Sequence, residues 1–436
     1  MPLYSAYATH TTPWLPGLTA GRAAPDSAVL FRDGEGRAFG LTMSDLAKGV
    51  YLTGAPRSGK TTVLYHLLSQ LIPRLGPHDG LIIFDPRGDL RRQFFRPGDI
   101  VLDPNPHGHG NATWSLFADL LAFGSTDYDL DQSAARIVTR LFADNQNQLT
   151  PFFTIAPRRL LENLLLVYAR TILAHPETAG QYRNETLLKY CANLSREKIR
   201  ELIRCAPAPG ELRSYLGNCA SDQALGVLGE LQASVSALRG FAGGSSPVFS
   251  VVDFARDGGG KLLFLEFDAS AADTQGPIFG LIEDLAYSTA LSPLPQKGKI
   301  YFCSDEGPLL GSNVEMLQRA LSFGAGQHIG GIFYAAQSNA QLHHCYGEAL
   351  TESMLADFGT VIALRMKDVT TRRYVQQLCG TCTFPMQHAR CGVVTTTLMQ
   401  VPALPDDQML SMATGDAIVL PPAGLPFSFH FLPWAG

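Results

Sequence analysis

The stretch "TGAPRSGKTT", Thr53 to Thr62, follows an apolar run and opens a helix-patterned one. Its spacing Gly54-x-x-x-x-Gly59-Lys60-Thr61 is the one that a phosphate-binding loop requires. In such a loop glycines let backbone N–H groups point inward, the lysine reaches the terminal phosphates, and the threonine hydroxyl can bind magnesium. We therefore expect nucleotide contacts along the whole stretch, from Gly54, Ala55, Pro56, Arg57, Ser58, Gly59, Lys60, Thr61 and Thr62.

The flanks of this loop have the structure that phosphate binding needs. "GVYLTG" is typical of a buried strand, and "KTTVLYHLLSQLI" places its apolar residues on one helical face. The loop would then lie at a helix N-terminus, where anions are favoured. A chance match is the alternative in a chain with 42 glycines, but the strand and helix on either side argue against it.

Composition limits the kinds of partner. The chain has 436 residues, enough for two or three domains, and is 46% apolar and 17% charged. The net charge of −5 means that contact with nucleic acid has to come from a local basic patch or a channel. No apolar run approaches the roughly 20 residues that cross a bilayer, and the N-terminus lacks a signal-peptide pattern. We expect a cytoplasmic protein without a transmembrane segment of its own.

Strand-like and helix-like stretches alternate over most of the chain, which predicts an α/β fold with a parallel sheet. "AVLFRDGEGRAFGLT" predicts a hairpin before the loop, and "GDAIVLPPAGLPFSFHFLP" predicts another near the end. From about Asp129 to Leu238 the pattern is helical, and strand signals return at "KLLFLEFD". We expect a nucleotide-binding domain formed by residues 1–115 and 246–436, interrupted by an inserted all-helical domain at 116–245.

Acidic and polar residues end two of the later strands. Asp305 follows the strand in "IYFCSDEG" and would hold Mg²⁺ together with Thr61, while Glu306 would polarise the attacking water. Gln337 closes "GIFYAAQ" and could sense the γ-phosphate, although a structural glutamine is the alternative. With Lys60, these residues predict the catalytic set of a RecA-like motor ATPase that uses ATP and Mg.

Two further groups of residues allow more than one interpretation. Cys379, Cys382, His388 and Cys391 in "CGTCTFPMQHARC" could surround zinc, but we favour a turn between two strands that happens to carry thiols. The helical region also carries arginines that form either a solvated face or a DNA-facing stripe: Arg136, Arg140, Arg158, Arg159, Arg196, Arg200 and Arg204.

The ordered motifs resemble a known family, the type IV coupling proteins of bacterial conjugation and secretion (the TraD/TraG group). The resemblance covers about residues 28 to 432. After the phosphate loop, the segments that carry it are "FDPRGDL", "WSLF", "PFFTIAPRRLLENLLL", "YFCSDEGPLLG", "AAQSNAQLHHCYG", "ADFGTVIALRMKD" and "GDAIVL".

The resemblance implies the roles already named for Lys60, Asp305, Glu306 and Gln337, and it places Asp85 near the nucleotide. It also implies a homo-hexameric ring around DNA, with single-stranded DNA favoured, and a helical domain that recognises substrate or relaxosome. Its partners would be the ATPases and inner-membrane components of a type IV secretion channel, at the cytoplasmic face of the bacterial inner membrane. Many family members have an N-terminal membrane anchor, which this sequence lacks, so attachment would come from a partner. A soluble subclass or a missing anchor are the alternatives.

Such rings complete each site with an arginine from the neighbouring subunit, which can raise the rate about 10³- to 10⁵-fold. The family would place it before the strand that ends in Gln337, but "SFGAGQHIGG" contains neither arginine nor lysine there. Arg319 and Arg365 are the substitutes to test, and either could be a surface residue.

We therefore expect an ATP-driven protein that recruits DNA, a nucleoprotein or a protein substrate and pumps it into a secretion channel. A HerA/FtsK-like or VirB-type motor is the alternative within the same class, and the long helical insertion argues against it. A nucleotide-binding scaffold or receptor with little turnover is the alternative of another class. The missing arginine favours the scaffold, and the Asp305-Glu306 pair opposes it.

Overall fold

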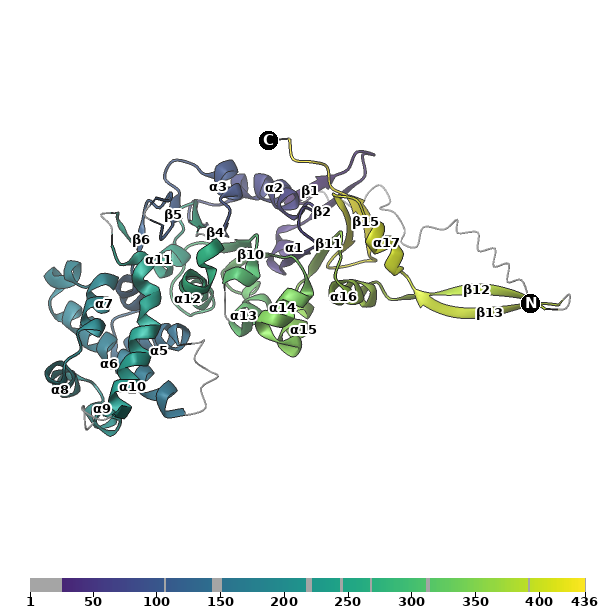
Figure 1. Cartoon of the computed structure of the whole chain (residues 1–436). Helices are drawn as coiled ribbons and strands as arrows, with labels where there is room; N and C mark the ends of the chain where they lie inside the picture. The colour runs from purple at the N-terminus through teal and green to yellow at the C-terminus, as the bar shows by residue number, and fades with distance from the viewer. Residues whose placement is uncertain are drawn as a thin grey trace. The chain divides into compact units, whose positions relative to one another are not determined.

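The structure is a computed structural model, and it describes residues 26–105, 107–142, 151–216, 222–243, 246–266, 269–310, 314–390 and 393–435 (Figure 1). The chain divides into two compact units. The first unit consists of Met1–Pro73, Ala335–Thr351 and Phe358–Gly436, and the second of Arg74–Tyr334 and Glu352–Asp357.

The first unit is built on a strand pair that carries the phosphate loop. Strand β3 (Val50–Thr53) runs parallel to β11 (Thr360–Leu364). Antiparallel strands then extend the sheet from β11 through β14 (Asp416–Leu420) to β15 (Phe427–His430), as the predicted C-terminal hairpin requires. The predicted N-terminal hairpin is confirmed as β1 (Val29–Arg32) paired with β2 (Ala38–Leu41).

Helices and a ribbon complete this unit. The helical elements are α1 (Met43–Ala47), α2 (Lys60–Leu71), η1 (Ile72–Arg74), α14 (Asn339–Tyr346), α16 (Val369–Cys379) and α17 (Asp406–Ser411), and α15 (Glu348–Ala356) begins in this unit and ends in the second. Figure 1 shows β12 (Thr381–Arg390) and β13 (Val393–Pro402) as one long antiparallel ribbon.

Burial explains why these elements hold together. Every residue of β3 is buried, and so is the apolar stripe predicted for α2, namely Val63, Leu64, Leu67, Leu68 and Leu71. An aromatic cluster joins the β1–β2 hairpin to the last strand, with Phe39 in contact with Phe31, Phe427, Phe429 and Phe431. Edge-to-face contacts dominate it, which is the geometry that aromatic pairs prefer.

The second unit contains a parallel sheet in the order β10-β9-β4-β8-β5. Almost all of its residues are buried, as expected for a parallel sheet with both faces covered. Its strands are β4 (Gly80–Phe84), β5 (Ile100–Leu102), β8 (Lys261–Leu265), β9 (Ile300–Ser304) and β10 (Ile329–Ala336). Its helices outside the insertion are α3 (Asp89–Phe94), α11 (Val251–Arg256), η5 (Ala269–Ala271), α12 (Ala272–Ala290), η6 (Gly307–Leu310) and α13 (Val314–Gly324).

A helical segment interrupts this sheet, as predicted. Its elements are α4 (Leu116–Ala122), α5 (Asp127–Leu141), α6 (Pro151–Ala174), η3 (Pro176–Gln181), α7 (Asn184–Ala192), α8 (Arg196–Cys205), α9 (Pro209–Leu216), α10 (Asp222–Val235) and η4 (Ser236–Phe241). At its base β6 (Thr113–Trp114) runs parallel to β7 (Val248–Phe249). The expected limits at residues 115 and 245 both lie inside the second unit, and we keep them as a proposal for the helical domain.

A buried carboxylate joins the two chain segments at this base. Asp119 is fully buried and accepts hydrogen bonds from Trp114 Nε1 (2.6 Å), Ser250 Oγ (2.6 Å) and Val252 N (3.0 Å). The chain entering the insertion is thereby tied to the chain leaving it. Among the described helices, none has the length and apolar character needed to cross a bilayer.

Candidate functional site

The phosphate loop of the first unit has positive φ at three positions, and glycine occupies two of them. Gly54, Arg57 and Gly59 have φ values of 157°, 61° and 111°, and Arg57 is the one non-glycine residue with positive φ in the described part of the chain. A Cβ on Gly54 would lie 2.7 Å from Ser58 Oγ and 2.9 Å from Leu364 Cβ, so glycine is required. Left-handed residues in such a series are typical of backbone nests that bind anions.

Lys60 begins α2 and turns back onto the loop. Its Nζ donates to the carbonyl oxygens of Gly54 (2.6 Å) and Ala55 (3.3 Å), and the residue is only 8% exposed. A buried ammonium needs acceptors, and phosphate oxygens would be stronger ones than neutral carbonyls. The side chain is therefore held where an anion on the loop can capture it.

Two distant motifs of the first unit hold this loop. Ala55 N donates to Arg365 O at 2.8 Å, just beyond the end of β11. Gly415 N donates to Ser58 O at 3.1 Å, and Thr414 Oγ1 donates to Arg57 O at 3.3 Å. The "ALRMKD" and "GDAIVL" motifs thus have a local physical role, since both fix the conformation of the loop.

Arg365 lies beside the loop of its own chain through that same carbonyl. Its side chain is half-buried, and its Nε is buried without a hydrogen-bond partner among the described residues. A buried guanidinium nitrogen without an acceptor is costly, which makes an anionic ligand favourable nearby. This position differs from that expected of an arginine acting on a neighbouring subunit.

Gln337 follows β10 and lies next to a buried polar network of the first unit. Its backbone N–H donates to Gln341 Oε1 at 3.4 Å. Asn339, two residues later, accepts from the Tyr51 hydroxyl at 2.8 Å, and its backbone N–H donates to Thr371 Oγ1 at 2.7 Å. Because Tyr51 belongs to β3, the segment that carries Gln337 is fixed to the strand that leads into the phosphate loop.

Carboxylates end the strands of the second unit one after another. Asp305 N donates to Phe84 O (3.2 Å), Asp85 N to Leu265 O (3.0 Å) and Glu266 N to Leu102 O (3.0 Å). Each of these three acids therefore extends the sheet by one hydrogen bond to the neighbouring strand, and Asp103 follows the edge strand β5. We call Asp305, Asp85, Glu266 and Asp103 the strand-end acids.

Asp85 is the most deeply buried of the strand-end acids. It is fully buried, and its carboxylate accepts from the backbone N–H groups of Asp89 (3.1 Å) and Arg91 (2.8 Å) at the start of α3. Burial, together with the nearby carboxylates of Glu266, Asp305 and Asp89, raises the pKa of Asp85 to about 7. A cation near this row would favour its ionised form.

The pair Asp305 and Glu306 lies at the end of β9, and both residues are buried. Gly307, which follows, packs so closely on the ring of Tyr334 that any Cβ there would collide with it. The chain thus turns tightly from β9 into η6 and holds both carboxyl groups at the strand end. This is the position that the sequence predicts for the pair.

Arg319 lies on α13 of the second unit and is exposed. Its guanidinium is 3.8 Å from Glu315, one turn earlier, a surface pair that contributes little. The segment after α13 turns through hydrogen bonds from Gly326 N to Phe323 O (3.2 Å) and from Gln327 N to Gly324 O (2.9 Å). Arg319 is thus accessible to another protein chain.

Two of the zinc ligands considered above lie far apart on one strand. Cys382 and His388 lie on the same extended strand β12, where six residues span about 20 Å. Cys379 ends α16, and Cys391 lies outside the described residues. The interpretation as strands joined by a turn agrees with the β12–β13 ribbon.

The arginines of the helical segment do not form one stripe. Arg136 lies over the ring of Phe123 (5.0 Å), Arg140 pairs with Asp284 of α12 (3.1 Å), and Arg158 donates to Phe142 O (3.0 Å). These side chains serve packing inside the second unit. Arg159, Arg200 and Arg204 are exposed, and the side chain of Arg196 lies outside the described ones.

Glu266 and Asp103 are site residues that the sequence reasoning missed. Glu266 pairs with Arg91 Nε at 2.6 Å, and both side chains are largely buried. The signal was present, because "FLEFD" and "VLDP" place an acid directly after an apolar strand, as "IFDP" and "FCSDE" do. Applying one rule to all four strands would have found the whole row.

A family model for the type IV secretion-system coupling protein DNA-binding domain matches residues 40–396. The chain belongs to this coupling protein family. The match includes the phosphate loop, the strand-end acids and the helical segment, and it confirms the resemblance seen in the ordered motifs. A search of curated protein sequences finds no match.

Solved structures show the same fold as this coupling protein. Bacterial conjugative coupling protein TrwBdeltaN70, trigonal form in complex with sulphate, aligns at a TM-score of 0.71 and 18% identity over 94% of this chain and 90% of that one. TrwB in complex with the ATP analogue ADPNP aligns at 0.70 and 18% identity, covering 91% and 87%. VirB4 of Thermoanaerobacter pseudethanolicus aligns at 0.57 and 13% identity, covering 96% and 99%. The fold is therefore the RecA-like P-loop fold with an all-α domain that the sequence predicts.

Proposed function

We propose that this coupling protein binds ATP with Mg²⁺ and uses its hydrolysis to move DNA, or a nucleoprotein or protein substrate, into a type IV secretion channel. The observation that carries the proposal is the left-handed phosphate loop with its buried Lys60, found in a member of the family. Solved TrwB structures hold ADPNP in one case and ADP with Mg²⁺ in another, which supports the same ligands here.

Each residue has a separate role in this proposal. Lys60 exchanges its two carbonyl acceptors for phosphate oxygens, and the loop N–H groups hold the phosphates. Thr61 and Asp305 are the residues for Mg²⁺, a cation that prefers oxygen ligands and supplies charge neutralisation during phosphoryl transfer. Glu306 orients and polarises the attacking water, and Gln337 reports the γ-phosphate through the segment fixed by Tyr51 and Asn339.

Asp85 and the arginines complete the assignment. We assign Asp85 to the neighbourhood of the nucleotide, as the family resemblance implies, and a cation near the strand-end acids would lower its raised pKa. We assign Arg365 a role in its own subunit, because it adjoins its own loop. Exposed Arg319 is then the candidate for the arginine that acts on a neighbouring subunit of a homo-hexameric ring.

The partners in this proposal are single-stranded DNA or a relaxosome, and the channel components at the cytoplasmic face of the bacterial inner membrane. A scaffold with little turnover is the second candidate, favoured by the absence of arginine and lysine from "SFGAGQHIGG". Turnover distinguishes the two, because a scaffold has no use for a water-polarising Glu306.

The test measures ATP turnover of the purified protein with and without single-stranded DNA. We expect DNA to raise turnover, Lys60→Ala and Glu306→Gln to abolish it, and Lys48→Ala, an exposed lysine of the same unit, to leave it unchanged. Turnover of the wild type no faster than that of Lys60→Ala would refute the motor and leave the scaffold.

Mixing experiments test the arginines. Inactive Arg319→Ala mixed with inactive Lys60→Ala should regain activity, because a site can then combine Lys60 of one subunit with Arg319 of its neighbour. Arg365→Ala mixed with Lys60→Ala should regain none, and exposed Arg373→Ala of α16 should be active on its own. No recovery with Arg319→Ala would remove it as the trans arginine.

A further inference from the structure

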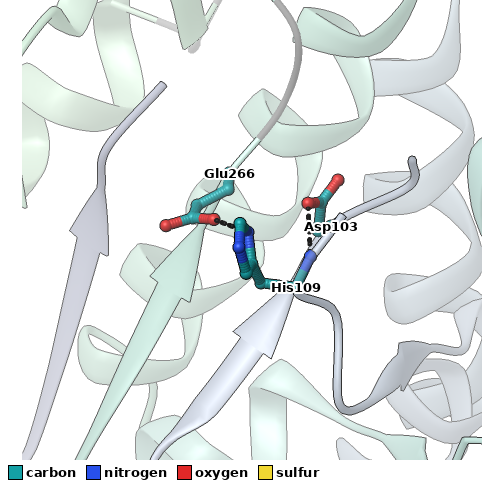
Figure 2. A group of neighbouring side chains, drawn as sticks. All are labelled: Asp103, His109 and Glu266. Atoms are coloured by element: carbon teal, nitrogen blue, oxygen red, sulfur yellow. Dashed lines mark hydrogen bonds and ion pairs between the residues drawn. The ribbon is translucent and has the colours of Figure 1, made fainter. Parts of the chain in front are cut away.

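A histidine lies beside Glu266 and Asp103, the two strand-end acids nearest the β5 edge of the sheet. Asp103 follows β5, Glu266 follows β8, and the loop after β5 places His109 beside them (Figure 2). One ligand atom from each of the three residues lies within 4.8 Å of the others. Ligands that share an ion at bonds of about 2.0–2.2 Å lie up to about 4 Å apart, so a small rotation of exposed His109 suffices.

One carboxylate oxygen of Glu266 faces the cluster and could bind a metal ion. Its Oε1 accepts from Arg91 Nε at 2.6 Å, whereas Oε2 has no hydrogen-bond donor among the described residues and faces His109 Nδ1 at 3.7 Å. The residue is only 6% exposed. Arg91 thus has the place of an outer partner that orients a ligating carboxylate, while the other oxygen points into the cluster.

The loop after β5 is shaped around Asp103. The carboxylate accepts from Asn105 N (2.9 Å) and from His109 N (3.0 Å), so it holds the backbone of the residue whose imidazole completes the cluster. A Cβ on Gly108 would collide with this carboxylate, which explains the small residue there. Gly108 and His109 thus lie against the acid that ends β5.

We propose that Asp103, His109 and Glu266 bind a divalent transition-metal ion such as Zn²⁺, Mn²⁺ or Co²⁺. One imidazole and two carboxylates suit these ions, whereas Mg²⁺ prefers oxygen ligands alone. Water fills the remaining positions, because His109 is largely exposed. The ion would link the ends of β5 and β8 and neutralise the outer part of the acidic row.

This site is distinct from the one proposed for nucleotide-bound Mg²⁺. Asp103 ends β5 and Asp305 ends β9, and the order β9-β4-β8-β5 separates them by three strand spacings, about 14 Å. The proposal therefore does not depend on ATP turnover, and the two can fail separately.

The test uses the full chain, freed of metal and nucleotide by dialysis against chelator, and titrated with Co²⁺ or Zn²⁺ alone. We expect one Co²⁺ per chain, with a d–d spectrum of nitrogen and oxygen ligands and no thiolate band. His109→Asn should weaken binding at least tenfold, since even outer partners of a metal contribute about 10- to 100-fold. His107→Asn, on the same loop but outside the cluster, should leave binding unchanged.

Additional variants and a competition with Mg²⁺ test whether the ion binds at this cluster. Glu266→Gln and Asp103→Asn should also fail to bind the ion. If either variant misfolds, the test rests on His109→Asn, because His109 is exposed and its replacement should leave the fold intact. Excess Mg²⁺ should not displace Co²⁺, and Lys60→Ala should bind it as wild type does. An absence of binding, equal affinity in His109→Asn, or a thiolate band would overturn the site.

Discussion

Replacing Asp119 tests how the helical segment is joined to the nucleotide domain. Its carboxylate accepts from Trp114 Nε1, Ser250 Oγ and Val252 N, at 2.6, 2.6 and 3.0 Å. Asp119→Ala leaves these donors without an acceptor, and Trp114 and Val252 are fully buried. At about 1–3 kcal/mol for each buried donor, the free energy of unfolding should fall by about 2–6 kcal/mol.

Urea denaturation followed by circular dichroism measures this change. Asp253→Ala is the matched control, because this exposed aspartate lies on α11, close to Ser250 and Val252, and makes only a long pair with Arg256 (3.9 Å). Its effect should stay within about 0.5 kcal/mol. A loss below about 1 kcal/mol for Asp119→Ala would show that the three hydrogen bonds do not hold the base of the insertion.

Three further predictions concern the pH dependence of Asp119, the phosphate loop and the hydrogen bond between Tyr51 and Asn339. Burial raises the pKa of Asp119 to about 6 from an ordinary 3.8, so ionisation disfavours the folded state. Relative to Asp119→Asn, the free energy of unfolding of the wild type should fall by about 3 kcal/mol as the pH rises from about 3 to 7, and a rise would contradict this. Gly54→Ala should weaken binding of an ATP analogue at least tenfold by fluorescence titration, while Gly180→Ala, which has open space around it, should not. Tyr51→Phe should lower the free energy of unfolding by about 1–2 kcal/mol in urea, since Asn339 loses a buried donor, and an unchanged midpoint would refute the network.

Local patterns were enough to predict the strands, the phosphate loop and part of the site. The strands predicted in "GVYLTG", "IYFCSDEG" and "GIFYAAQ" are confirmed as β3, β9 and β10. They were predictable because short apolar runs between helix-length stretches have few other structures open to them. Asp305 was found because an acid directly after such a strand lies at the sheet edge, whereas Asp85 was named from the family resemblance.

Contacts between distant segments could not be predicted from the sequence. The pairing of Arg140 with Asp284 and of Arg91 with Glu266 joins residues more than a hundred positions apart. Nothing local distinguishes such an arginine from a solvated one, so the helical arginines were left open. The extension of β12 likewise separates Cys382 from His388, because residues close in sequence become far apart on a strand.

The central claim is that ATP hydrolysis moves DNA, and displacement of streptavidin from biotinylated single-stranded DNA measures it most directly. We predict that the wild type with ATP and Mg²⁺ displaces streptavidin from one end of the strand. Glu306→Gln should bind ATP and DNA but displace none, and a non-hydrolysable analogue should support none. Displacement that is absent from the wild type while ATP is being hydrolysed, or that persists in Glu306→Gln, would contradict the account.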